Sequence, residues 1–319
     1  MSDIAAIAQL RKISVDVVNS ASLLKRYVFY KFGLRALGSL TATFATLVFV
    51  FDHASSYHSR LISLLPALTS FYLLFVLLGL IDDLADLQID STGSAPRVAP
   101  NAVGKRRLSL WGGLTLTSAS IIILNFDSEA LIVALCALGA MLVGDLGFKS
   151  KMSTDTAPGP AALYRWVGLA LFYEGAPFLM FLYVYYAWRH SSAISLTVAA
   201  QLTITTIFWA GYEFWKYSRH ITRPDWSSYG LPWQITRRYL VGILAISFAS
   251  QIITWRIALL PIWFALYASV LCGSFGALLW LLSPTSQTSR TATLGYLFIV
   301  GMNVGLLAAT LEFGGASPQ

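Results

Sequence analysis

Long apolar runs alternate with short polar connections along most of this chain. Each run is long enough, as a helix rising about 1.5 Å per residue, to cross a bilayer core of roughly 30 Å. The runs lie at about 34–51, 62–80, 108–125, 129–148, 160–187, 192–215, 236–254, 256–282 and 292–311, and only Thr254–Arg256 separates the seventh from the eighth. The pattern predicts an all-α, polytopic membrane protein with nine transmembrane helices in a single domain over residues 1–319.

The N-terminal segment has a different pattern. Residues 2–32 place apolar side chains such as Ile4, Leu10 and Val17 at helical spacing, with lysines and arginines among them. This combination is typical of a helix that lies in the membrane interface. We therefore expect an N-terminal interfacial helix before the first span.

Composition agrees with a membrane protein. Hydrophobic residues make up 56% of the chain and charged residues only 12%, with a mean hydropathy of +0.66. Cys136 and Cys272 both lie inside apolar runs, so neither a disulfide framework nor a zinc site is indicated. The net charge is +7, but the basic residues flank apolar runs, which favours membrane lipids and phosphates over nucleic acid as partners.

The basic residues also predict the topology. If the N-terminus shares a side with the connections after spans 2, 4, 6 and 8, that side holds every one of the 22 lysines and arginines except Arg60, Arg189 and Arg256. Basic residues accumulate on the cytoplasmic side of membrane proteins. We expect an integral, multi-pass protein of a cell inner membrane or an organelle membrane, with the N-terminus and the longer polar connections in the cytoplasm.

Three aspartates follow the second apolar run. Asp82, Asp86 and Asp90 are four residues apart, which on a helix stacks them along one face with roughly 6 Å of rise between neighbours. Such a row at a membrane edge needs a counter-charge, and Mg²⁺ bound to a phosphate-bearing substrate is the usual one. Arg97 follows in the same connection and is a candidate phosphate contact. The alternative is a solvated helix end whose acids fall at this spacing by chance.

A second polar group ends the sixth run. Glu213 stands where the apolar run stops, Tyr212 precedes it, and Lys216 and Tyr217 follow at the three- and four-residue spacings that share a helix face. Downstream, Asp225 lies among further aromatic residues. The alternative is an interfacial aromatic belt that contains a Glu–Lys pair.

Two other acidic positions lie in or beside apolar runs. Asp145 and Lys149 close the fourth run at a spacing that allows them to pair, and Lys149 could also reach a phosphate. Glu174 lies within the fifth run, close to Pro177. An ionisable residue inside a transmembrane span is often functional, but a structural role for Glu174 beside a proline kink is equally well supported here.

The two acidic stretches together resemble the UbiA superfamily of intramembrane prenyltransferases. That family has nine transmembrane helices and two acidic motifs at the cytoplasmic ends of helices 2 and 6. The first motif is matched by Asp82, Asp86 and Asp90 and by the later Pro96–Arg97 and Gly104, although Val98 stands where proline is usual. In the second motif Glu213 takes the first acidic position, but Tyr217 stands where a second aspartate is common. This form is similar to a divergent branch of the superfamily.

The resemblance implies a UbiA-type bundle and a set of site residues. Asp82, Asp86, Asp90 and Glu213 would be catalytic and hold Mg²⁺ on an isoprenyl diphosphate, with Asp225 as an alternative ligand. Substrate-binding positions would be Arg97, Lys149, Lys216, Tyr212, Tyr217 and Asp225. The implied reaction is Mg²⁺-dependent transfer of a prenyl group to an aromatic or lipid acceptor. A membrane terpene cyclase acting on the same diphosphate is the alternative. A transporter is less favoured, because the acids gather at one membrane face.

Overall fold

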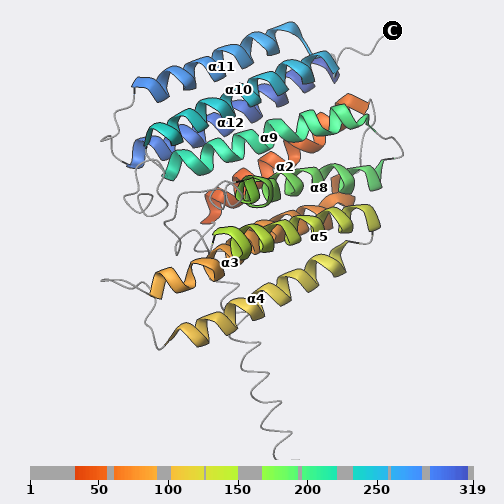
Figure 1. Cartoon of the computed structure of the whole chain (residues 1–319). Coiled ribbons are helices and arrows are strands. Elements are labelled where there is room, and N and C mark those ends of the chain that lie inside the picture. Colours follow the sequence, from red (N-terminus) through yellow and green to blue (C-terminus); the bar gives the residue numbers. More distant parts are fainter. Residues whose placement is uncertain are drawn as a thin grey trace, which may run out of the picture. The chain divides into compact units, whose positions relative to one another are not determined.

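The computed structural model describes residues 33–55, 61–91, 102–125, 127–149, 167–192, 196–220, 233–257, 260–281 and 288–314. Within these ranges the chain is helical and contains no strand, which confirms the all-α prediction. The α-helices, shown in Figure 1, are α2 (Gly33–Ser55), α3 (Leu65–Ser91), α4 (Val103–Leu124), α5 (Ser128–Leu142), α8 (Gly175–Ser191), α9 (Val198–His220), α10 (Trp233–Ile257), α11 (Ile262–Leu281) and α12 (Thr288–Gly314). The predicted interfacial helix over residues 2–32 lies outside the described residues.

Each of the nine predicted spans contains one of these helices. In the described part of the chain, six helices are long and apolar enough to cross a membrane, namely α3, α4, α5, α10, α11 and α12. Of the other three, α8 has 17 residues and α9 carries the buried Glu213 and Lys216. Polar groups in a membrane-embedded helix are stable only where protein covers them.

The chain divides into two compact units, residues 1–38 with 69–176 and residues 39–68 with 177–319. In the first unit, α3 packs on α4 through a buried cluster that contains Val76, Leu80 and Leu87 of α3 and Leu110 of α4. The amide of Asn125, just after α4, donates to Ser70 Oγ on α3 at 3.0 Å. These contacts hold α3 and α4 side by side.

Two π-helical segments lie in the same unit. The segment η4 (Val143–Lys149) continues α5, and η5 (Leu169–Tyr173) packs against it. A Cβ at Gly144 would lie 2.6 Å from the backbone nitrogen of Tyr173, so only glycine allows this approach. In its described part, the fifth predicted span is not one continuous helix. The segment η5 ends in a turn at Glu174, and Pro177 stands in the first turn of α8, where its missing N–H costs nothing.

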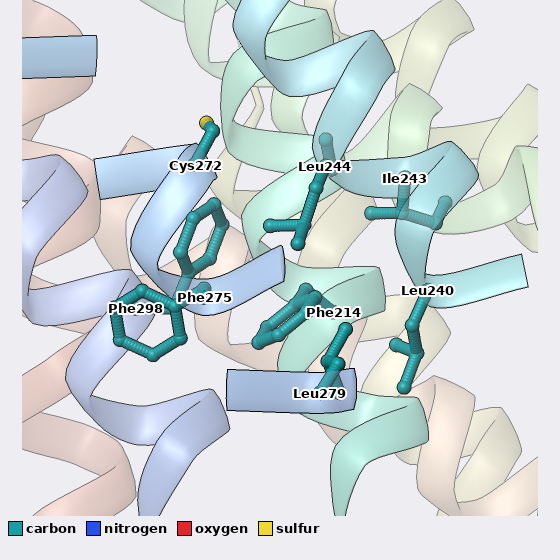
Figure 2. Packing of buried hydrophobic residues seen from close by; sticks show 9 residues of the cluster. Phe214, Leu240, Ile243, Leu244, Cys272, Phe275, Leu279 and Phe298 are labelled. Carbon is teal, nitrogen blue, oxygen red and sulfur yellow. The ribbon is translucent and has the colours of Figure 1, made fainter. Parts of the chain in front are cut away.

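The second unit has an aromatic core formed by α9, α10, α11 and α12 (Figure 2). The rings of Phe214 and Phe298 lie 4.7 Å apart, and Phe275 lies 5.2 Å from Phe298. The other members are Ala210, Leu240, Ile243, Leu244, Cys272 and Leu279. The seventh and eighth spans are two separate helices, as predicted, but the predicted boundary at Thr254–Arg256 is wrong. These residues belong to α10, which continues to Ile257, and α11 begins at Ile262.

The helix α12 packs closely on α11 because it carries glycines four residues apart. The hydroxyl of Tyr267 on α11 donates to the carbonyl of Gly301 at 2.5 Å, and its ring lies against Gly305. A Cβ at Gly305 would collide with that ring. Pairs of small residues at this spacing are a common means of close helix packing in membranes, where burial from water does not drive association.

Polar bonds join α2 to α8 and α12 in this unit. The indole N–H of Trp188 donates to the buried carboxylate of Asp52, and Phe51 and Tyr185 stack beside that indole. The amide of Asn303 on α12 donates to Thr43 Oγ1 at 3.2 Å. The sequence patterns had not singled out Asp52, which is an acid held by an aromatic residue more than a hundred positions away.

Candidate active site

The first acidic motif lies in the last turns of α3. Leu80, Leu84 and Leu87 lie on the side of α3 that packs against α4. At about 100° of rotation per residue, Asp82 and Asp86 fall on the opposite side of the helix. Both aspartates are half-buried, and one carboxylate oxygen of Asp86 is fully buried. The expected shared face is therefore confirmed for these two acids.

The neighbouring Asp83 has a different role. Its carboxylate lies 3.8 Å from the guanidinium of Arg106 at the start of α4, and the Arg106 side chain is 45% exposed. Exposed ion pairs of this kind contribute about 0–1 kcal/mol. The pair joins the end of α3 to the start of α4, and it separates Asp83 from the row formed by Asp82 and Asp86.

The second motif is a buried ion pair on α9. Glu213 is 0% exposed, Lys216 is 8% exposed, and the ammonium lies 3.8 Å from Glu213 Oε2. The pair forms because residues three apart meet on one helix face. A buried charge needs a partner, and each member of this pair provides one for the other. The predicted Glu–Lys contact is confirmed, and its burial places it inside the second unit instead of in an exposed belt.

Tyr217 stands where a second acid was expected. Its ring lies 5.2 Å from the Lys216 ammonium and 4.8 Å from the ring of Tyr239 on α10. The first contact is a cation–π interaction, and the second belongs to the packing of α9 on α10. Tyr217 therefore supplies a neutral partner to Lys216 and leaves Glu213 as the one carboxylate of this pair.

Aromatic rings extend from the ion pair along α8 and α9. Tyr212 lies 5.7 Å from Trp215 on its own helix and 6.1 Å from Phe181 on α8, and Phe181 lies 6.4 Å from Phe208. We call Phe181, Phe208, Tyr212 and Trp215 the aromatic row. Sequence analysis had missed Phe181. The available signal was its register with Tyr185 and Trp188, four and seven residues later on one face of α8.

Two more carboxylates are buried where η4 and η5 meet. Asp145 is 0% exposed within η4, and Glu174 is 7% exposed in the turn after η5. Segments of π-helix are frequent at functional sites. The contact between η4 and η5, in which Gly144 lies against the backbone of Tyr173, could not be predicted from the sequence because the two residues are far apart in it.

The remaining predicted positions are described only in part. Asp90 lies on α3 and Lys149 ends η4, but their side chains are outside the described residues, as are Arg97 and Asp225 entirely. Among the side chains that are described, no group of three or more His, Cys, Asp or Glu could hold a metal ion. Asp82 and Asp86 nevertheless offer hard oxygen donors on one helix face, which is the chemistry that Mg²⁺ prefers.

Comparison with known proteins gives a relationship of fold. No family model and no curated protein matches this chain. One similar solved structure comes from work on the biosynthesis of digeranylgeranylglyceryl phosphate synthase in membranes. The match covers 91% of this chain and 99% of that one, at 12% sequence identity and a TM-score of 0.54. The chain thus has the helical fold of a membrane-bound synthase.

Proposed function

We propose that this protein is an intramembrane prenyltransferase of the UbiA type. It ionises an isoprenyl diphosphate and transfers the prenyl group to an aromatic or lipid acceptor. The observation that carries the proposal is the buried Glu213–Lys216 pair beside the aromatic row, because it combines charges for a diphosphate with a wall for an apolar chain. The fold supports it, since the name of the similar synthase describes a lipid that carries two geranylgeranyl groups.

Each charged residue has a role toward the diphosphate in this proposal. Asp82, Asp86 and Asp90 would hold Mg²⁺, and Glu213 would hold a second ion, with Asp225 as an alternative ligand. Bound Mg²⁺ supplies positive charge that neutralises the leaving diphosphate. Lys216, together with Arg97 and Lys149, would contact the diphosphate oxygens directly. The unequal distribution of lysines and arginines between the two sides of the membrane supports a cytoplasmic position for these residues.

The reaction proceeds by breaking one bond and forming another. The C–O bond between the prenyl C1 and the diphosphate breaks, and its electron pair leaves with the diphosphate. The acceptor donates an electron pair to C1 and loses a proton. The allylic cation formed in between carries delocalised positive charge, which aromatic faces such as Tyr212 and Trp215 stabilise. Water would quench that cation, and a protein interior within a bilayer excludes it.

Release of inorganic pyrophosphate tests the proposal directly. The purified protein, in detergent with Mg²⁺, is given geranyl, farnesyl or geranylgeranyl diphosphate together with candidate aromatic and lipid acceptors. We expect Asp86→Asn and Glu213→Gln to lower the release rate by at least about 100-fold, as removal of a charge-stabilising group does in other enzymes. Asp83→Asn is the matched control, because this acid is one residue from the row and pairs with Arg106 on the α4 side. Equal activity in all three variants would refute the proposal.

A membrane terpene cyclase is the second candidate, and the aromatic row favours it. In a cyclase, double bonds of the same chain capture the cation, and the reaction ends when the product loses a proton or adds water. Four rings in series could shield such a cation as it moves. A cyclic hydrocarbon or alcohol formed without any acceptor would identify a cyclase, whereas pyrophosphate release that depends on an acceptor would identify a transferase.

A further inference from the structure

Two consecutive arginines, Arg237 and Arg238, lie where the membrane-spanning part of α10 begins. Leu240 and Leu244 lie on the side of α10 that packs in the aromatic core. At about 100° of rotation per residue, Arg238 lies about 160° from Leu240, on the opposite side of the helix, and it is exposed. Arg237 lies about 60° from Leu240, at the edge of the packed side. The outward side of α10 therefore carries a charge at the boundary of the span.

Arg237 is held at this boundary by α11. Its Nε–H donates to the carbonyl of Leu279 at 2.7 Å, and its guanidinium carbon lies 4.8 Å from the centre of the Trp280 ring. Trp280 is 67% exposed, one residue before the last residue of the α11 span. Tryptophan at the end of a span is typical of the level of the lipid headgroups. The contacts with α11 thus fix one guanidinium at headgroup level, next to Arg238.

The outward side of α10 continues from Arg238 as a row of small residues. Gly242, Ala245 and Ala249 lie four, seven and eleven residues after Arg238, which places them in line on its side of the helix. All three are exposed, and a Cβ at Gly242 would meet nothing within 4 Å. The larger Ile246, which is 42% exposed, lies beside them. These three small residues, the α10 strip, leave room for an apolar chain directly below the arginine.

The described carboxylates of the second unit do not compete for Arg238. They are Asp52, Glu213 and Glu312. Asp52 and Glu213 are buried, and their carboxylates contact Trp188 and Lys216. Glu312 bonds to Trp263 in the first turn of α11, whereas the arginines lie beside the last turn of that helix. The start of α10 therefore presents positive charge to its surroundings.

We infer that the outward side of α10 binds one anionic phospholipid. Its phosphate contacts Arg238 and Arg237, and one of its acyl chains lies along the α10 strip. Guanidinium groups match the geometry of phosphate oxygens, and bases at the end of a span attract anionic headgroups. The site lies apart from the residues proposed for the diphosphate, so it does not depend on the proposed reaction.

The combination of charge and apolar surface selects this ligand. A zwitterionic lipid carries a positive group beside its phosphate and gains less from the arginines. Inorganic phosphate has no acyl chain to cover the strip. A second copy of the chain, related by a two-fold axis along the membrane normal, would bring two Arg238 side chains together at one level, where like charges repel.

Thermal unfolding of the full-length protein in a neutral detergent tests this inference, because a ligand of the folded state raises Tm. The protein is titrated at constant ionic strength with dioleoylphosphatidylglycerol, with dioleoylphosphatidylcholine and with inorganic phosphate. We expect the anionic lipid to raise Tm at concentrations at which the other two do not. Arg238→Gln should move the midpoint of that rise to an about fivefold higher lipid concentration, which is the effect of one base near an anionic surface.

The matched control is Arg256→Gln. Arg256 lies on the same side of α10, about five turns further on, and its guanidinium contacts Trp255 of the same helix. Its substitution should move the midpoint by less than about twofold, since a lone base contributes no paired site. An unchanged midpoint in Arg238→Gln, an equal shift in both variants, or an equal rise in Tm with inorganic phosphate would each overturn the inference.

Native mass spectrometry gives a second measurement. The protein is released from micelles that contain equal amounts of the two lipids. Wild-type protein should retain one phosphatidylglycerol in preference to phosphatidylcholine, and Arg238→Gln should lose this preference. A wild-type dimer without bound lipid would show that a second copy covers this side of α10, and it would contradict the proposed site.

Discussion

The buried pair of Glu213 and Lys216 leads to a prediction of unequal effects. The perturbations are Lys216→Met, Glu213→Gln and the double variant. Lys216→Met keeps the length of the side chain but leaves the Glu213 carboxylate, which is 0% exposed, without its ammonium partner. Removing one member of a buried pair typically costs about 3–5 kcal/mol. We expect Lys216→Met to destabilise the protein by an amount near this range.

Glu213→Gln should cost less. In this variant the Lys216 ammonium still has the ring of Tyr217 as a partner, 5.2 Å away, and the Lys216 side chain is 10% exposed. A cation–π contact contributes about 0.5–2 kcal/mol, which offsets part of the loss of the carboxylate. The double variant removes both charges and so leaves no uncompensated buried charge, which is the main cost when one partner is removed alone. The expected order of stability is therefore double variant, Glu213→Gln, then Lys216→Met.

Equilibrium unfolding in detergent measures this order, and pyrophosphate release measures activity in the variants that fold. The double variant should be folded and inactive, which separates the role of the pair in chemistry from its role in stability. The reasoning fails if the double variant is as unstable as Lys216→Met, because the two charges would then not be coupled. An active double variant would remove both residues from the proposed site.

Three further predictions concern packing in the second unit, and thermal unfolding checks each of them. Gly305→Ala should destabilise by about 1–3 kcal/mol, since its Cβ collides with the Tyr267 ring, whereas Gly38→Ala, with nothing within 4 Å, should not. Trp188→Phe should cost about 1–3 kcal/mol, because it removes the indole N–H that donates to a buried carboxylate on α2. Arg237→Met should destabilise by about 0.5–1.5 kcal/mol through the loss of its 2.7 Å bond to a carbonyl in the last turn of α11.

The positions of the helices could be predicted because each apolar run is one helix in nearly every case. Length and hydropathy are local properties, and the membrane requires them of each span separately. The fifth span is the exception. Its break at Glu174 directly follows Tyr173, whose backbone lies against Gly144, and these two residues are far apart in the sequence. No local pattern records such a contact.

The candidate site was predictable to the extent that it is made within single helices. The shared face of Asp82 and Asp86 and the pairing of Glu213 with Lys216 both follow from helical spacing. The opposition of Phe181 and Tyr212 could not be predicted in this way, because it depends on how α8 packs against α9. Asp52 escaped notice for the same reason.

The presence of Tyr217 where an acidic residue was expected has a physical explanation. A carboxylate at this position would put a second negative charge one turn from Glu213, inside a unit where Lys216 is the cation in contact with it. Like charges at this spacing repel, and burial strengthens the repulsion. The tyrosine gives Lys216 a neutral ring and packs on Tyr239, so the site keeps its charge balance when no substrate is bound. If the proposed reaction is correct, α9 supplies one carboxylate instead of two for metal binding, and we expect a larger share of the diphosphate charge to be neutralised by Lys216.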